Sequence, residues 1–205
     1  MIMKTNSNTY TIIYSAILVV IVAFLLAFVS QALKSKQDAN VALDQKKQIL
    51  YSLNIRGLDG AEAEAKYNEV VKSEESRNGK SYFVCEVGGQ KKYVFPLKGM
   101  GLWGGISAFV SVNDDENTIF GVYFNHEGET AGLGAEIKDS QAWQEKFQGK
   151  KIFGENGDIA IKVVKKVENP ASEVDCVTGA TLTSDGVSNM LRKGLSEYIN
   201  DNKKK

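Results

Sequence analysis

The sequence predicts an α+β fold, in which a single N-terminal transmembrane helix precedes an antiparallel-sheet domain with flanking helices. Residues 5–33 contain no charged side chain, short β-rich runs separated by turn residues begin at Ser81, and the last residues repeat apolar side chains at helical spacing. We therefore expect a short N-terminal segment over 1–9, a transmembrane helix over 10–33, a helical stalk over 34–80 and a β-rich domain over 81–205.

The apolar segment is long enough to cross a membrane. About 20 apolar residues span the hydrocarbon core as a helix, which satisfies its own backbone polar groups. Tyr10 and Tyr14 suit the interface at one end, and Lys34 and Lys36 follow the other. A cleaved signal peptide is the alternative, because residues 30–32 resemble a cleavage site, but the stretch exceeds a typical signal core.

The lysines around this segment favour a cytoplasmic domain. Lys4 precedes the span, whereas Lys34, Lys36, Lys46 and Lys47 follow it. Positive residues near a span concentrate on the cytoplasmic side.

Composition argues against several functions. Lys and Arg total 25, as do Asp and Glu, so the chain lacks the positive field that attracts nucleic acid. Cys85 and Cys176 are too few for a disulfide framework or a thiolate metal site. They either lie buried as small apolar residues, the preferred interpretation, or pair in an oxidising compartment. His126 is the only histidine, so we expect no metal site and no catalytic residue.

The pattern after the anchor predicts helices first and then strands. Residues 38–54 predict a stalk helix, residues 61–75 a polar helix, and residues 77–79 a turn. The expected strands are 82–87, 92–96, 106–112, 118–124 and 159–164, with hairpin connections at 88–89 and 113–115. Ser140 is expected to cap a short helix that reaches Phe147.

The final helix should begin after Thr183, Ser184 or Asp185 as its N-cap. One apolar face recurs at helical spacing, and its members are Val187, Met190, Leu191, Leu195, Tyr198 and Ile199.

Residues 175–184, just before this helix, read DCVTGATLTS. Free amides and the dipole at a helix N-terminus favour a phosphate, and the small residues Gly179 and Ala180 let a bulky group approach the backbone. By physical chemistry alone the segment is an anion site or, as the alternative, a Ser/Thr-rich turn that only caps its helix.

The string Asp175-x-x-Thr178-Gly179-Ala180-Thr181 resembles the flavinylation motif of the FMN-binding domain family. The resemblance implies that Thr181 carries FMN through a phosphoester bond, received from FAD by the action of a flavin transferase. A threonine hydroxyl is a weak nucleophile without a base, which fits an external enzyme that recognises Asp175 and residues 178–181. Leu182 and Thr183 would flank the attached FMN, which is the redox group.

Two further segments extend the resemblance. Residues 125–134 (NHEGETAGLG) are similar to the H-x-G-E-T-P-G-L-G loop shared by two families, NqrC of the Na⁺-translocating NADH:quinone reductase and RnfG of the Rnf complex. Residues 99–105 (GMGLWGG) are similar to the G-x-G-L-W motif of the NqrC family. Ala131 and Ala135 depart from the usual proline and glycine, and the lost proline should loosen the loop.

The resemblance implies that these two segments contact the flavin. The glycines predict a backbone bent tightly against something, which would be the isoalloxazine ring. The implied cofactor contacts are Leu102, Trp103, Glu129, Thr130, Gly132, Leu133 and Gly134. For Trp103, the alternative is a tryptophan that closes the core.

The resemblance to the NqrC family implies an electron-transfer flavoprotein that relays electrons from NADH toward quinone as part of an oxidoreductase, without an active site of its own. Its cofactor would be FMN. Its partners would be the other membrane, flavin and iron–sulfur subunits of the Na⁺-translocating reductase, with a flavin transferase during maturation. NADH should not bind here, since no strand leads into a G-x-G-x-x-G helix start.

The family places the domain outside the cytoplasm, on a bacterial inner membrane, with residues 1–9 inside; the lysine count points the other way. Three alternatives remain open: an RnfG-type flavoprotein of an Rnf complex, a stand-alone extracytoplasmic flavin carrier, and a membrane-tethered, non-redox interaction domain.

Overall fold

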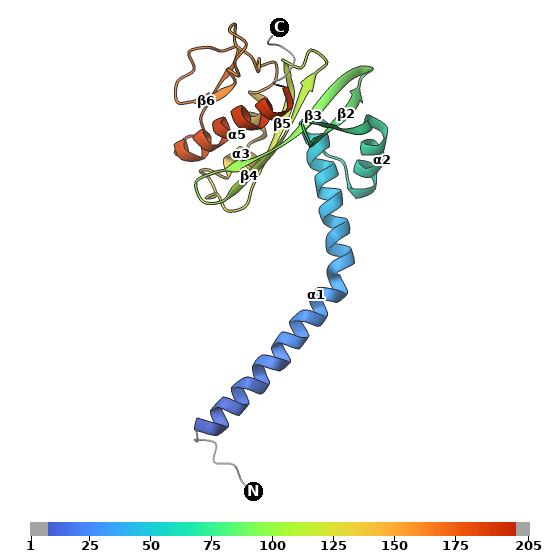
Figure 1. Ribbon diagram of the computed structural model, residues 1–205, viewed down its shortest axis with the longest axis vertical. Helices are drawn as coiled ribbons and strands as arrows, with labels where there is room; N and C mark the ends of the chain where they lie inside the picture. Colours follow the sequence, from blue (N-terminus) through green and yellow to red (C-terminus); the bar gives the residue numbers. More distant parts are fainter. Residues whose placement is uncertain (1–7, 200–205) are drawn as a thin grey trace. The chain divides into compact units, whose positions relative to one another are not determined.

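The computed structural model describes residues 8–199, and Figure 1 shows their helices and strands. The chain divides into two compact units, with the division between Asp44 and Gln45. The first helix, α1 (Asn8–Ser52), runs through this division. The predicted segment 1–9 lies mostly outside the described residues.

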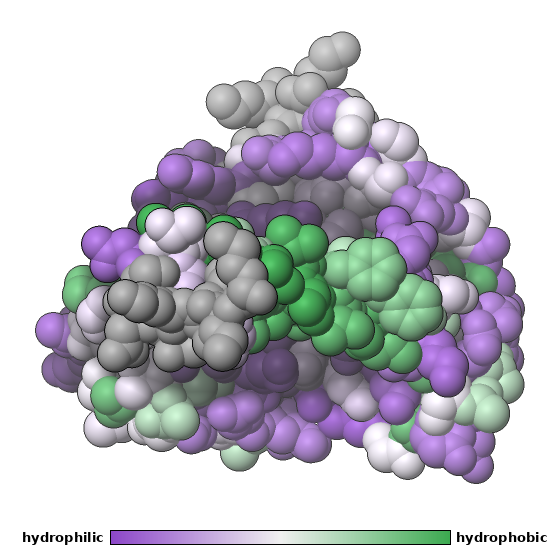
Figure 2. Space-filling view, turned by 90° about the horizontal axis from the view of Figure 1, so that it is seen from below, coloured by the Kyte–Doolittle hydropathy of each residue, from purple (hydrophilic) through white to green (hydrophobic). Residues whose placement is uncertain are grey.

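α1 is a continuous helix of 45 residues. Among the described residues it is the one helix long and apolar enough to cross a membrane, and its apolar side chains are exposed. Figure 2 shows such side chains as a hydrophobic band against a largely hydrophilic surface. The stalk predicted over 38–54 is the end of this same helix, which stops at Ser52.

The second unit is built on a five-stranded antiparallel sheet in which each strand pairs with the next along the chain. Its strands are β1 (Val71–Arg77), β2 (Lys80–Val87), β3 (Gln90–Met100), β4 (Gly105–Asn113) and β5 (Ile119–His126). Gly88 and Gly89, both at positive φ, form the two-residue hairpin between β2 and β3, as predicted. The predicted turn at 77–79 is also a hairpin, with Asn78 and Gly79 at positive φ.

Two of the expected elements are wrong. The polar helix predicted over 61–75 ends early, because α2 (Gly60–Val70) gives way to β1. β1 is an edge strand that pairs only with β2, and an edge strand tolerates the charged sequence VKSEESR. The strand predicted over 159–164 shrinks to β6 (Lys162–Val164), which lies outside the main sheet and pairs in parallel with β7 (Glu173–Asp175).

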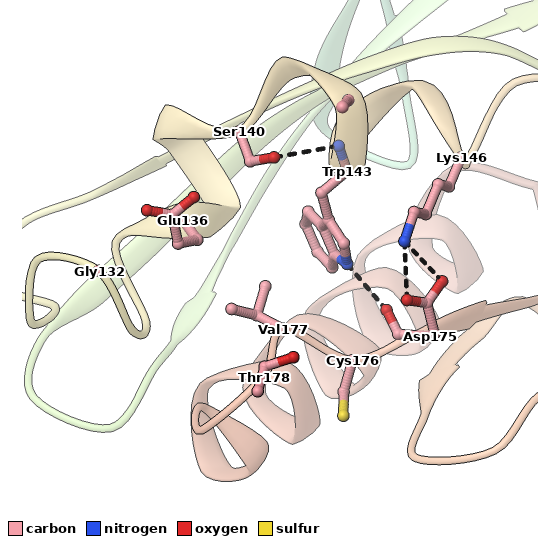
Figure 3. A pocket seen from close by; sticks show the side chains of 10 residues that line it. Gly132, Glu136, Ser140, Trp143, Lys146, Asp175, Cys176, Val177 and Thr178 are labelled. Carbon is pink, nitrogen blue, oxygen red and sulfur yellow. Dashed lines mark hydrogen bonds and ion pairs between the residues drawn. The ribbon is translucent and has the colours of Figure 1, made fainter.

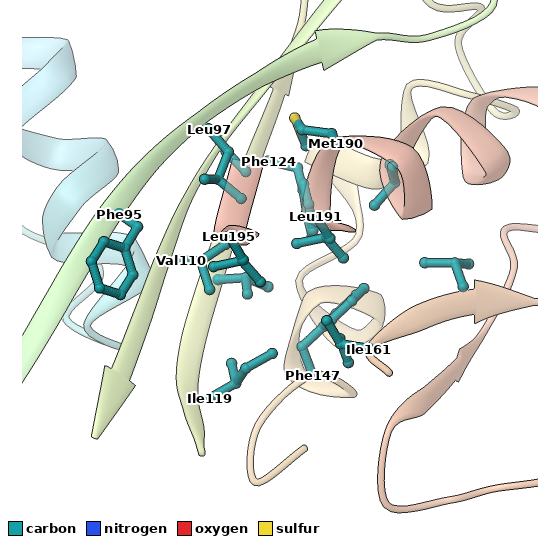
Figure 4. Packing of buried hydrophobic residues seen from close by; sticks show 14 of the residues in the cluster. Phe95, Leu97, Val110, Ile119, Phe124, Phe147, Ile161, Met190, Leu191 and Leu195 are labelled. Atoms are coloured by element: carbon teal, nitrogen blue, oxygen red, sulfur yellow. The ribbon is translucent and has the colours of Figure 1, made fainter. Parts of the chain in front are cut away.

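One face of the sheet holds the main core. Ile106, Ala108, Val110 and Val112 alternate along β4 toward this face. The C-terminal helix α5 (Thr181–Ile199) lies across it, and Figure 4 shows Met190, Leu191 and Leu195 of α5 packed with residues of the sheet. The predicted apolar face of the last helix is therefore confirmed from Val187 to Tyr198.

The opposite face of the sheet receives the end of α1. Ser111 of β4 donates a hydrogen bond from its hydroxyl to the Ser52 carbonyl. Gly121 of β5 has no room for a side chain, because a Cβ there would lie 2.5 Å from the same carbonyl oxygen. The sheet is thus covered on both faces.

Ser140 separates two short helices, α3 (Glu136–Asp139) and α4 (Gln141–Glu145). Its hydroxyl accepts a hydrogen bond from the Trp143 amide at 3.3 Å, which confirms Ser140 as an N-cap. Trp143 and Phe147 then pack against Phe124 of β5.

Candidate functional site

Three segments that are far apart in the sequence meet at the start of α5: the β3–β4 turn (residues 100–105), the loop after β5 (127–135) and the turn before α5 (176–180). A Cβ added at Gly186 of α5 would lie 2.4 Å from the Met100 carbonyl oxygen. Another at Gly179 would lie 2.8 Å from a methyl carbon of Leu133. The fold therefore brings together the three motifs that carry the family resemblance.

The Glu129 carboxylate joins these segments. It is only 7% exposed, and it accepts hydrogen bonds from the Trp103 amide at 2.9 Å and from the Thr183 hydroxyl. Burial raises the pKa of Glu129, but hydrogen bonds from Thr183 and from the amides of residues 102–104 outweigh it, so its pKa lies below the usual range. Glu129 is ionised at neutral pH.

Thr181 is the first residue of α5 and is half-buried. The predicted N-cap at Thr183, Ser184 or Asp185 is wrong, because the Ser184 amide already donates to the Ala180 carbonyl at 3.0 Å. The amides of residues 181–183 precede the first intrahelical bond, and the first turn carries no acidic residue. This end of α5 is favourable for a phosphate.

The hydroxyl groups of this segment differ sharply in access. Thr183 and Ser184 are buried; Thr183 donates to Glu129, and Ser184 accepts from the Val177 amide at 3.3 Å. Thr178 is exposed but lies before Gly179, whose positive φ turns the chain. Of the hydroxyls within the first turn of α5, Thr181 is the accessible one.

The surface around Thr181 is apolar. Within residues 45–198, every large apolar side chain that is exposed belongs to the three converging segments or to the first turn of α5: Met100, Leu102, Trp103, Leu133 and Leu182. Trp103 is 70% exposed, so it does not close the core. Exposed apolar groups gathered in one place mark an interaction or ligand site.

These features fit FMN. A phosphoester needs a reachable hydroxyl, which Thr181 supplies, and its charge suits the N-terminus of α5. The flat apolar ring of a flavin needs apolar side chains, which the exposed group above supplies.

A cavity of about 310 Å³ lies beside this segment, and Figure 3 shows its lining. Thr178, Cys176 and Gly132 line it, whereas Thr181 does not. Asp175 forms an ion pair with Lys146 at 2.7 Å, and the carbonyl of Asp175 accepts a hydrogen bond from the Trp143 indole at 2.8 Å. Sequence reasoning missed Lys146 and Trp143, because neither belongs to a motif.

The remaining residues of the predicted site are mostly turn formers. The Thr130 carbonyl accepts from the amides of Leu133 and Ala135, both at 3.1 Å, and Gly132 has a positive φ of 72°. Cys85 and Cys176 are both free thiols; burial raises the pKa of Cys85 to about 12. Sequence reasoning also missed Met100, although it adjoins the Leu102-Trp103 pair.

Comparisons with known proteins agree with this site. Residues 101–196 match the model of the FMN-binding domain family. The crystal structure of NqrC, the corresponding subunit of the Na⁺-translocating NADH-quinone reductase, from Parabacteroides distasonis is 40% identical, with a TM-score of 0.74 over 82% of this chain and 95% of that chain.

Two curated NqrC proteins of the same reductase are also similar. The one from Vibrio vulnificus is 44% identical over 114 residues, which are 55% of this chain and 44% of that protein. The one from Vibrio parahaemolyticus is 36% identical over 162 residues, or 78% of this chain and 59% of that protein. The chain thus matches about half the length of these curated relatives.

The fold and the site define the class: a flavoprotein domain that binds FMN, preceded by a helix able to span a membrane. This chain belongs to the NqrC family of the Na⁺-translocating NADH-quinone reductase. The prediction of this family, and of its α+β fold, is confirmed.

Proposed function

We propose that this chain is an electron-transfer subunit of a Na⁺-translocating NADH:quinone reductase and carries FMN covalently on Thr181. The observation that carries the proposal is the place of Thr181, an accessible hydroxyl in the first turn of α5, with the exposed apolar side chains of the domain gathered around it. A turn that served only as a cap would not need that apolar surface.

The attachment is a balanced phosphoryl transfer. The Thr181 oxygen forms a bond to the FMN phosphorus of FAD, the pyrophosphate bond breaks, AMP leaves, and the hydroxyl proton passes to a base. The hydrogen bonds of Asp175, Glu129 and His126 lead to other residues and place no base at Thr181. A flavin transferase therefore supplies the base, with Asp175 and residues 178–181 as its recognition signal.

The residues of this chain would hold the group in two ways. The α5 N-terminus stabilises the phosphate charge, and Met100, Leu102, Trp103, Leu133 and Leu182 cover apolar ring surface. FMN, when bound, supplies the one- and two-electron chemistry. The protein contributes position and exclusion of water, and no residue of this chain acts as an acid or base.

The partners follow from this role. Electrons would arrive from an iron centre in a neighbouring subunit and leave to another flavin, so this protein works within a membrane complex. We place the soluble domain on the extracytoplasmic side of a bacterial inner membrane, anchored by α1. Protease treatment of oriented vesicles tests this: digestion of the domain only from the cytoplasmic side would contradict it.

The flavin attachment is tested by producing the protein together with a flavin transferase. Wild type should show flavin fluorescence after denaturing electrophoresis, because a phosphoester survives unfolding. Thr181→Val, which has similar volume but no hydroxyl, should show none, whereas Thr181→Ser should retain the label. A thermal melt shows whether each variant is folded.

The result that would overturn the proposal is fluorescence in a folded Thr181→Val protein, or the added mass on the Thr178 or Thr183 hydroxyl. A wild type that never acquires flavin would favour the non-redox interaction domain instead.

A further inference from the structure

The geometry points to Glu129 as a positioning residue: its carboxylate clamps the β3–β4 turn to the first turn of α5 and so fixes Leu102 and Trp103 beside Thr181. This assigns to Glu129 a role other than contact with the flavin. The clamp itself is a property of the protein without cofactor, while its consequence for the flavin rests on the function proposed above.

The first evidence is that both carboxylate oxygens are engaged by the protein. Oε1 accepts the Trp103 amide at 2.9 Å, and Oε2 accepts the Thr183 hydroxyl. The amides of Leu102 and Gly104 also act on this carboxylate. A group that is almost fully buried and bonded at both oxygens is not free to contact a ligand.

The second evidence is that two glycines make room for the carboxylate. A Cβ added at Gly101 would lie 2.4 Å from Oε1, and one at Gly134 would lie 2.4 Å from Oε2 and 2.6 Å from the Thr183 hydroxyl oxygen. Neither glycine has a positive φ, so a need for left-handed backbone does not explain them. The space they leave is occupied by Glu129.

The third evidence is the chemistry of the donors. Backbone amides and a hydroxyl all donate toward Glu129, and an ionised carboxylate only accepts. Such charge-assisted bonds are about twice as strong as neutral ones. Glutamine has the same shape, but its amide nitrogen would face either the Trp103 amide or Thr183, donor against donor.

The consequence lies in the turn. The amides that Glu129 holds belong to the residues whose side chains form part of the apolar surface, Leu102 and Trp103. Those side chains are exposed and have no core contacts to fix them, so the backbone clamp determines where they lie relative to α5.

Hydrogen exchange of the protein without flavin tests the clamp. In Glu129→Gln, the amides of residues 102–104 should exchange about 10- to 100-fold faster than in wild type. The matched control is Glu127→Gln, a nearby exposed glutamate of the same loop, which should leave these rates unchanged. Unchanged rates in Glu129→Gln would overturn the clamp.

A second variant guards against a general loss of folding. Gly134→Ala keeps the charge but pushes a methyl group against Oε2, and it should speed exchange of the same amides while the amides of β2 and β3 stay protected. Equal acceleration throughout the sheet would show a merely structural defect and would contradict the clamp.

The link to the cofactor has a separate measurement. Iodide should quench flavin fluorescence more strongly in loaded Glu129→Gln than in loaded wild type, because the covering side chains are no longer fixed. Equal quenching would overturn this link. Failure of wild type to load flavin would refute the proposed function and leave the exchange result standing.

Discussion

The first turn of α5 and the rest of the same helix present their leucines in opposite ways. Leu182 is 60% exposed, whereas Leu191 and Leu195 are fully buried against the sheet. The buried residues stabilise the fold, while the exposed one joins an apolar surface around Thr181 that folding alone does not require. A single helix thus serves the core along most of its length and the site at its start.

The largest effect is expected where α5 enters the core. Leu191→Ala leaves a cavity among Phe124, Leu195 and their neighbours, and should lower the free energy of unfolding by about 2–5 kcal/mol. Chemical denaturation of the soluble domain measures it. A loss below about 1 kcal/mol would mean that this part of α5 is not core.

The next effect concerns the contact between α5 and the β3–β4 turn. Gly186→Ala places a Cβ 2.4 Å from the Met100 carbonyl oxygen, which is backbone and cannot rotate away. Overpacking of about 1–3 kcal/mol should outweigh the gain of about 1 kcal/mol in helix propensity. A variant that melts higher than wild type would contradict this close approach.

Acid should weaken the region that leads into the site through Glu173. The amides of Asn169 and Glu168, and then Lys162, hold the pKa of this β7 carboxyl at about 2, below its unfolded value near 4.5. Its contribution to stability is therefore complete above about pH 4.5 and is lost as the pH falls toward 2. Denaturation of Glu173→Gln should show a shallower loss of stability over this interval; an unchanged slope would refute the assignment.

The smallest effect on stability is expected at the exposed leucine. Leu182→Ala should change the free energy of unfolding by no more than about 0.5 kcal/mol. It should nevertheless increase the access of iodide to a flavin on Thr181. Paired with Leu191→Ala, it separates the two roles of the helix; large destabilisation in Leu182→Ala would erase the distinction.

The sequence predicted the elements whose patterns are strong, and it failed where tertiary context decides. The apolar run of α1, the Gly88-Gly89 hairpin and the apolar face of α5 were all readable. β1 was not, because VKSEESR has the composition of a polar helix and becomes a strand only by pairing with β2 across Asn78-Gly79. The start of α5 was placed late, because Thr183 and Ser184 look like caps but are buried.

Within the site, motifs located the segments but not the purpose of each residue. The sequence explains the glycines as approaches to a ring, whereas Gly101 and Gly134 border the Glu129 carboxylate in the structure. Nothing in the sequence pairs Glu129 with Thr183, since the two lie 54 residues apart. Such contacts follow only from the fold.

The most direct test of the central claim is peptide mass analysis of protein produced with a flavin transferase. The peptide that contains residues 175–184 should gain the mass of FMN less one water, with fragmentation placing it on Thr181, and Thr181→Val should lose it. An unmodified Thr181 in protein that retains flavin after denaturation would contradict the account.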